Sequence, residues 1–303
     1  MLGIGLFVYP VVSNYIFELN ASTATQNYDN TVRELNKENL KVQRQRAVVY
    51  NENLEGNPAH DPFLEGSGAV LDPEYANILK IDEQGTMGYI TIPKIGVQLS
   101  ILHGTSNNVL QKNVGHFEGS SLPVGGKTTH SVLTGHSGLA HARIFTDLIK
   151  LETGDIFYLH VLDQTLAYQV DQIKTVLPDE TEELRRFENE DYCTLVTCTP
   201  YGVNTHRLFV RGTRIEYIPE VEQELIANSA PSFGWFTGWN VMMGIAVGVG
   251  YLVVFAIVLL LRRRKKKNRM NGGLTWQTTA GGTSKRRKVK REKPRWWDDA
   301  AGV

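Results

Sequence analysis

Cysteine is scarce in this sequence, since 303 residues contain only Cys193 and Cys198. Two cysteines are too few for a small domain held together by several disulfides, and too few for a four-cysteine zinc site. We expect no disulfide between them, because an offset of five residues along one strand spans roughly 16 Å. The same offset points the two side chains to opposite faces of a strand, so we expect Cys193 to be inert.

Net charge is also absent, because 32 lysines and arginines balance 32 aspartates and glutamates. The balance conceals an asymmetry: residues 262–303 hold 15 basic and 3 acidic residues, whereas residues 1–261 hold 17 and 29. Hydrophobic residues make up 42% of the chain, which argues against disorder throughout. The charge split predicts two compartments or a charged tail.

Charged residues are missing from one long stretch near the carboxyl end. Val241 to Leu261 contains 21 residues without a charge, enough for a helix to cross the roughly 30 Å core of a bilayer. Trp235 and Trp239 precede this stretch, and the run RRRKKK at 262–267 follows it. We therefore predict a transmembrane helix at 241–261 and a cytoplasmic tail. We expect the tail to contact lipid headgroups rather than nucleic acid.

Residues 1–17 also lack charge, although Pro10 and Asn14 interrupt them and no basic segment precedes them. A cleaved signal peptide and a peripheral apolar segment are the alternatives. We favour a signal anchor whose cytoplasmic start is missing from this sequence. Two spans then make a multi-pass membrane protein with residues 18–240 outside the cell, in keeping with their acidity.

The external region begins with helical patterns. Within residues 20–55, Tyr28, Val32, Leu35 and Val42 recur near helical spacing and predict one or two amphipathic helices. The Pro- and Gly-rich residues 57–68 predict a loop.

From Gly88 onward, short runs rich in Val, Ile, Tyr, Phe and Thr predict a series of strands rather than alternating βα units. Ala142 to Leu151 has helical spacing and predicts one intervening helix. The pattern indicates a mostly antiparallel β-barrel or sandwich.

Cys198 ends an apolar strand, and an eight-residue loop leads from it to Arg207. A thiol at a strand end beside a cation fits a nucleophile of low pKa, and a buried structural cysteine is the alternative. His136, in LTGHSG, and His206 are the histidines available as a base, or are ordinary surface residues. A metal site formed by Cys193, Cys198 and His206 lacks a known spacing, so we discount it.

Three separated motifs resemble those of the class C, pilus-assembling sortases of Gram-positive bacteria. They are TLVTCTPYGVNTHRLFVRG at 194–212, VGHFEGSSLPVGGKTTHSVLTGHSGL at 114–139 and DPF at 61–63, and they occur in the family's order. The resemblance covers about residues 1–265. The missing cytoplasmic amino terminus and the basic tail after Lys267 depart from the family pattern.

The resemblance implies a mainly β fold, the eight-stranded sortase barrel with short helices, an N-terminal helical and lid extension and two transmembrane helices. It makes Cys198 the nucleophile, His136 the general acid and base, and Arg207 the electrostatic stabiliser. Asp61, Pro62 and Phe63 become a lid, in which Asp61 pairs with Arg207 and Phe63 covers the Cys198 sulfur. No cofactor or metal is needed. The acidic residues 179–183 are similar to a calcium-binding loop of another sortase class, but we favour a solvated loop.

The implied reaction is transpeptidation: cleavage of an LPXTG-like sorting signal between Thr and Gly, followed by isopeptide bonding to a pilin lysine. A sortase that anchors proteins to peptidoglycan and a non-catalytic membrane-tethered binding protein are the alternatives. The expected organisation is a signal anchor (1–17), a helical extension with the lid (18–80), the catalytic barrel (81–218), a linker (219–240), a transmembrane helix (241–261) and a basic cytoplasmic tail (262–303).

Overall fold

The computed structural model describes residues 2–54, 60–64, 71–229, 248, 250–251 and 255–265. The chain divides into two compact units, Met1–Gly234 and Trp235–Val303. In the second unit the described residues are helical. The fold and the candidate site belong to the first unit.

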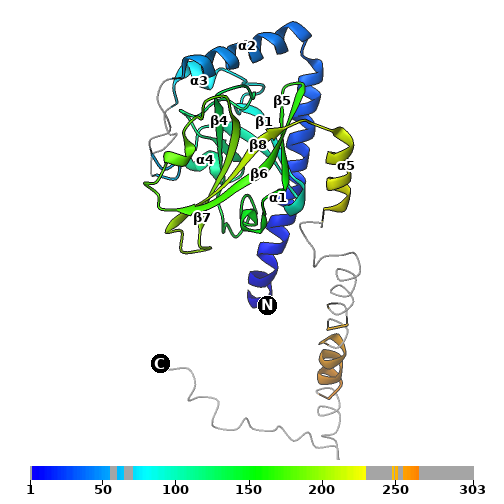
Figure 1. The fold of residues 1–303 in the computed structure, drawn as a ribbon. Coiled ribbons are helices and arrows are strands. Elements are labelled where there is room, and N and C mark those ends of the chain that lie inside the picture. Colours follow the sequence, from blue (N-terminus) through cyan, green and yellow to red (C-terminus); the bar gives the residue numbers. More distant parts are fainter. Residues whose placement is uncertain are drawn as a thin grey trace, which may run out of the picture. The chain divides into compact units, whose positions relative to one another are not determined.

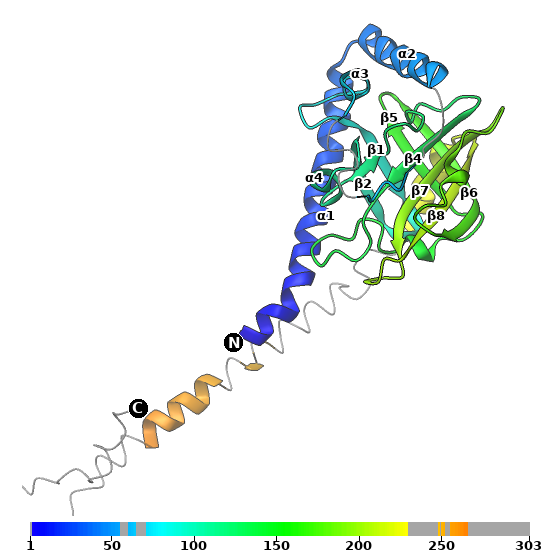
Figure 2. The same cartoon turned by 90° about the vertical axis from the view of Figure 1, so that its left-hand side faces the viewer.

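Eight strands close into a barrel in the order β1-β2-β3-β4-β7-β8-β6-β5 (Figures 1 and 2). Their bounds are β1 Thr86–Ile92, β2 Val97–His103, β3 Val114–His116, β4 Thr129–Thr134, β5 Ile156–Val161, β6 Gln164–Val176, β7 Asp191–Thr199 and β8 His206–Ile215. The pairs β2–β3 and β4–β7 are parallel, and the other neighbours are antiparallel. The predicted mostly antiparallel barrel is confirmed, since only two of these neighbouring pairs are parallel.

Two helices precede the barrel, as the spacing in residues 20–55 predicts. Helix α1 (Leu2–Glu34) runs along the barrel, and α2 (Lys37–Asn53) follows it (Figure 2). The buried Tyr28 hydroxyl joins α1 to the barrel, since it donates to the Met87 carbonyl over 2.8 Å and accepts the Leu162 N–H over 2.9 Å. Val42 does not share this burial, because its side chain is exposed.

Within the described residues, no helix has both the length and the apolar character required to cross a bilayer. Residues 2–17 form the start of α1, and most of the predicted span 241–261 lies outside the described residues. The two transmembrane helices therefore stay predictions.

The helix predicted at Ala142–Leu151 is wrong. Only one 3-10 turn, Leu148–Lys150, forms there. The apolar spacing has another cause: the side chains of Ala142, Ile144 and Phe145, in an irregular loop, and of Leu148, in the 3-10 turn, are all fully buried. The short helices elsewhere are α3 (Pro73–Ala76), α4 (Asn107–Leu110), α5 (Pro219–Asn228) and the 3-10 turns Pro93–Ile95 and Glu182–Leu184.

Alternation along β7 and β8 separates two apolar clusters. Cys193, Leu195 and Val210 belong to the main core. Val196 and Phe209, one residue out of phase, belong to a second cluster with side chains from other segments. We call this cluster the outer patch: Phe117, Val132, Leu184, Val196 and Phe209. Cys198 and Arg207 share the phase of Val196 and Phe209, so they lie on the same face as the outer patch.

Candidate active site

Cys198 and Arg207 lie opposite each other on neighbouring antiparallel strands. They are register partners near the β7–β8 turn, and each side chain is about nine-tenths buried. Residues that pair directly across an antiparallel ladder hold their side chains close together. The ladder therefore places a guanidinium beside the thiol without help from the intervening loop.

His136 reaches the same place from the end of β4. The Gly135 N–H donates to the Val196 carbonyl over 3.0 Å, and the Ser137 hydroxyl donates to the Cys198 carbonyl over 2.6 Å. These bonds fix the backbone on both sides of His136 to β7. Gly135 suits this approach, because a Cβ there would lie 2.7 Å from the Phe145 ring.

Asp61 binds the guanidinium of Arg207 from the loop after α2. Arg207 Nε donates to Asp61 Oδ1 over 2.9 Å, and Nη2 donates to Oδ2 over 2.5 Å. Both side chains are only 10% exposed, so this is a buried, bidentate pair rather than a weak surface ion pair. Arg207 Nη1 donates to the carbonyls of Asn204 and His206. All three guanidinium nitrogens are thus engaged while Asp61 is in place.

Phe63 lies against both other functional side chains. The Phe63 ring centroid is 5.4 Å from the His136 ring centroid, and the Arg207 guanidinium carbon lies 5.2 Å from the Phe63 ring centroid. The ring also packs on the outer patch. Pro62, which lies between Asp61 and Phe63 in the sequence, is buried. The segment Asp61–Phe63 therefore covers His136 and Arg207 with a polar and an apolar contact.

Burial holds the thiol and the imidazole in their neutral forms. Burial raises the pKa of Cys198, Arg207 lowers it and Asp61 raises it again, and the net direction is upward. Burial also lowers the pKa of His136. The pKa of Arg207 is lowered by burial but raised more by its bonds to Asp61 and by Cys198. The covered site thus favours thiol and imidazole over thiolate and imidazolium.

The remaining candidates lie elsewhere. Cys193 is a free, fully buried thiol in the main core, and burial raises its pKa well above the usual value. His206 is half-buried, and its Nδ1 lies 2.9 Å from the Thr205 hydroxyl. In the acidic segment 179–183, Glu183 pairs with Lys174. Among the described residues, no three potential metal-ligating side chains cluster.

Some residues around the site carry no signal in the sequence. Ser137 and the outer patch belong to it only because separated segments meet there. Leu184 illustrates this: it is fully buried in the patch, yet it comes from the polar loop between β6 and β7. Alternating hydrophobicity within β7 and β8 is the one signal that could have indicated part of the patch.

Comparison with known proteins gives consistent matches. The family model for the sortase domain matches residues 90–215. A Streptococcus pneumoniae sortase C, whose structure was described for catalysis and pilin substrate specificity, is 47% identical, with 64% of this chain and 97% of that chain covered and a TM-score of 0.60. The pilus-related sortase C of group B Streptococcus is 43% identical, covers 64% and 97%, and has a TM-score of 0.59. Sortase A of Bacillus anthracis is 22% identical, over 68% of this chain and 93% of that protein.

Proposed function

The chain belongs to the sortase family of transpeptidases, and we propose that it polymerises pilins by joining an LPXTG-like sorting signal to a pilin lysine. The observation that carries the proposal is the juxtaposition of Cys198 with Arg207 on adjacent strands, with His136 beneath the same segment, Asp61–Phe63. The pilin substrate is inferred from the sortase C structures that this chain resembles.

In the first half-reaction, His136 takes the thiol proton of Cys198, and the sulfur attacks the carbonyl carbon of the signal threonine. The tetrahedral intermediate carries an oxyanion, and Arg207 stabilises it or holds the substrate backbone. Protonated His136 gives its proton to the leaving glycine amine as the Thr–Gly bond breaks. The product is a thioester between Cys198 and the donor pilin.

In the second half-reaction, a lysine amine of the acceptor pilin attacks the thioester. His136 accepts a proton from the amine, the carbon–sulfur bond breaks and Cys198 is restored. An isopeptide bond joins the two pilins. Neither half-reaction calls for a metal or a cofactor.

The segment Asp61-Pro62-Phe63 acts as a lid over this chemistry. Its bonds use the guanidinium nitrogens that the reaction needs, and Phe63 packs on the outer patch, which lies on the same face of β7 as Cys198. The donor must displace the lid. The apparent affinity for the donor is therefore the affinity of the open form multiplied by the fraction of molecules that are open. Removal of Asp61 and exposure to solvent both lower the pKa of Cys198, so opening also favours the thiolate.

We place the catalytic barrel outside the cell, anchored by residues 1–17 and 241–261. The support is the absence of charge in both stretches and the basic run at 262–267. Pilin substrates are external, so this topology brings the barrel to its donors and acceptors.

The test is transfer of an LPXTG-type peptide to a lysine-bearing pilin domain by the detergent-solubilised chain. We expect Cys198→Ala to abolish transfer, and His136→Ala and Arg207→Ala each to lower kcat/KM by about 10²–10⁴-fold. Cys193→Ala is the control and keeps most activity, since this thiol lies in the main core. Transfer that depends on Cys193 but not on Cys198 would refute the assignment. Transfer to peptidoglycan amines alone would favour the anchoring function.

A further inference from the structure

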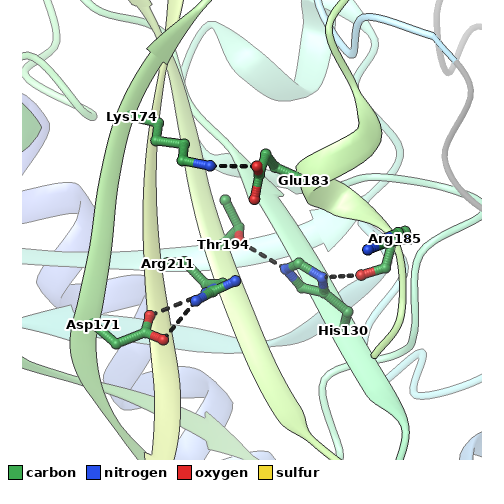
Figure 3. Close-up of polar contacts among 7 residues, drawn as sticks. All are labelled: His130, Asp171, Lys174, Glu183, Arg185, Thr194 and Arg211. Atoms are coloured by element: carbon green, nitrogen blue, oxygen red, sulfur yellow. Dashed lines mark hydrogen bonds and ion pairs between the residues drawn. The ribbon is translucent and has the colours of Figure 1, made fainter. Parts of the chain in front are cut away.

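The face that carries Cys198 continues along β7 to Val196 and then to Thr194. His130, on β4, lies beside Thr194 on this face, with its Nε2 2.7 Å from the Thr194 hydroxyl oxygen. The other ring nitrogen, Nδ1, lies 2.7 Å from the carbonyl oxygen of Arg185 (Figure 3). The imidazole therefore bridges the barrel wall and the loop between β6 and β7.

The bonding partners fix the tautomer of His130. A carbonyl oxygen only accepts, so Nδ1 carries the hydrogen that binds Arg185. Burial lowers the pKa of this fully buried histidine to about 4, which keeps the ring neutral near pH 7. Nε2 therefore accepts the hydroxyl hydrogen of Thr194. Both ring nitrogens are satisfied, and neither is left to take part in chemistry.

The two neighbours of Arg185 reach in different directions. Leu184 is fully buried in the outer patch, the same cluster on which Phe63 packs. Arg186 Nη2 donates to the Leu54 carbonyl over 2.5 Å, immediately after the last residue of α2. A cation at a helix C-terminus is favourable, and here it holds the point from which the chain leads to Asp61.

A further contact fastens the same loop to the barrel. Glu183, in the 3-10 turn that ends at Leu184, pairs with Lys174 of β6 (Figure 3). This pair is partly exposed, and such pairs contribute little. The bond from the fully buried His130 ring to the Arg185 carbonyl is direct and 2.7 Å long, so it is the stronger restraint on Arg185.

We propose that His130 is a positioning residue of the donor site, which holds the β6–β7 loop at Arg185. It thereby fixes the position of Leu184 in the outer patch, and that of Arg186, which binds the chain at Leu54 before the lid. The inference depends on the proposed function, because the outer patch serves a donor only if the chain binds sorting signals. It assigns two separable effects: one on donor affinity through Leu184, and one on lid closure through Arg186.

The first experiment measures the effect on donor affinity through Leu184 in a chain whose lid contacts have been removed. In an Asp61→Ala, Phe63→Ala background, KM and kcat are measured for hydrolysis of a soluble LPXTG-type peptide by the detergent-solubilised chain. His130→Asn keeps an N–H near the position of Nδ1, whereas His130→Gln reaches toward Thr194 and leaves Arg185 unbonded. We expect Asn to resemble the parent and Gln to raise KM by about 3- to 10-fold with little change in kcat, as for one lost hydrogen bond. Arg186→Ala should leave KM unchanged in this background.

The second experiment measures the lid in a chain that keeps Asp61 and Phe63 and carries Cys193→Ala. The rate of Cys198 modification by a bulky maleimide reports lid opening. We expect His130→Gln and Arg186→Ala to raise this rate several-fold, and His130→Asn to leave it near the parent value. His103→Ala is the matched control, since His103 is another buried histidine bonded to backbone carbonyls, those of Ile78 and Gly85. It should change neither KM nor the labelling rate.

The outcomes separate the two proposals. If no peptide cleavage depends on Cys198, the proposed function fails. If cleavage depends on Cys198 but the Asn and Gln variants share one KM and one labelling rate, only the role of His130 fails. An effect of His103→Ala equal to that of His130→Gln would reduce His130 to a general contributor to stability and would also overturn the inference.

Discussion

At the scale of single residues, burial is the largest cause of the raised pKa of Cys198, and the Asp61 carboxylate adds to it. The same carboxylate occupies the Arg207 guanidinium and raises the pKa of Cys198. Burial lowers the pKa of His136 in the covered site. A thiol and a neutral imidazole form a poor nucleophile and a poor acid, so the lid that we propose restrains the chemistry as well as the access.

Removing the charge of Asp61 is expected to lower the pKa of Cys198. In Asp61→Asn the carboxylate no longer disfavours the thiolate, and Arg207 is released to stabilise it. The midpoint of the pH profile for Cys198 alkylation by a small neutral reagent should move to lower pH. Asp171→Asn is the control, because Asp171 pairs with Arg211 on the same strand as Arg207 but away from the thiol. A midpoint that stays or rises would contradict the electrostatic role of Asp61.

The sequence predicts residues of this site only where a local pattern marks them. Cys198 and His136 stand at strand ends, and Arg207 follows one short loop later, so strand pairing alone brings it to the thiol. No local pattern of this kind distinguishes His130, which lies within β4. Its partner Arg185 lies 55 positions away, and its role arises only when the barrel closes.

At the scale of elements, α5 occupies part of the expected linker. It is joined to the barrel by Glu222, whose carboxylate lies 2.9 Å from His160 Nε2 on β5 and accepts the Tyr217 hydroxyl over 2.7 Å. Burial raises the pKa of Glu222, but the bonds from His160 and Tyr217 outweigh it, and the net direction is downward. The polar composition of residues 219–240 does not indicate that the Glu222 carboxylate is buried.

Glu222→Gln is expected to lower the thermal midpoint of the barrel. A group with a lowered folded-state pKa stabilises fully above its usual pKa, about 4.5 here, and loses this contribution as pH falls through the lowered value. The difference from the parent should therefore be about 1–2 kcal/mol at pH 6 and shrink below pH 4.5. Near-ultraviolet circular dichroism across pH would measure it. Glu220→Gln is the control, because Glu220 is exposed, and an equal loss there would disprove the docking role.

Element type is predictable where one periodicity dominates, and it fails where burial has another cause. The alternation in β7 and β8 gives correct strands and correct faces. The segment Ala142–Leu151 has apolar residues at helical spacing because tertiary packing buries them, with Ile144 and Phe145 beside Gly135, not because it is a helix. Burial by tertiary contact imitates the pattern of an amphipathic helix.

At the scale of the whole molecule, the charge asymmetry gains a functional meaning from the site. The acidic part of the sequence contains the barrel, and the basic part begins directly after the uncharged stretch 241–261. Positive charge is retained on the cytoplasmic side of a membrane, so the two parts are predicted to face different compartments. The pilin-joining function that we propose requires the barrel to be outside, because pilin donors and acceptors are outside the cell.

Protease added to intact wall-less cells is therefore expected to digest the barrel and to spare the tail. An epitope placed after residue 303 should persist on a protected fragment, whereas an epitope after Ser229, the residue that follows α5, should be lost. Replacing the six basic residues at 262–267 by neutral ones is the matched variant, since it removes the charge that retains the tail inside. In that variant a fraction of the tails should become accessible. Equal digestion of tail and barrel in the parent chain would refute the topology, while the roles of Cys198, His136 and Arg207 would still rest on their own test.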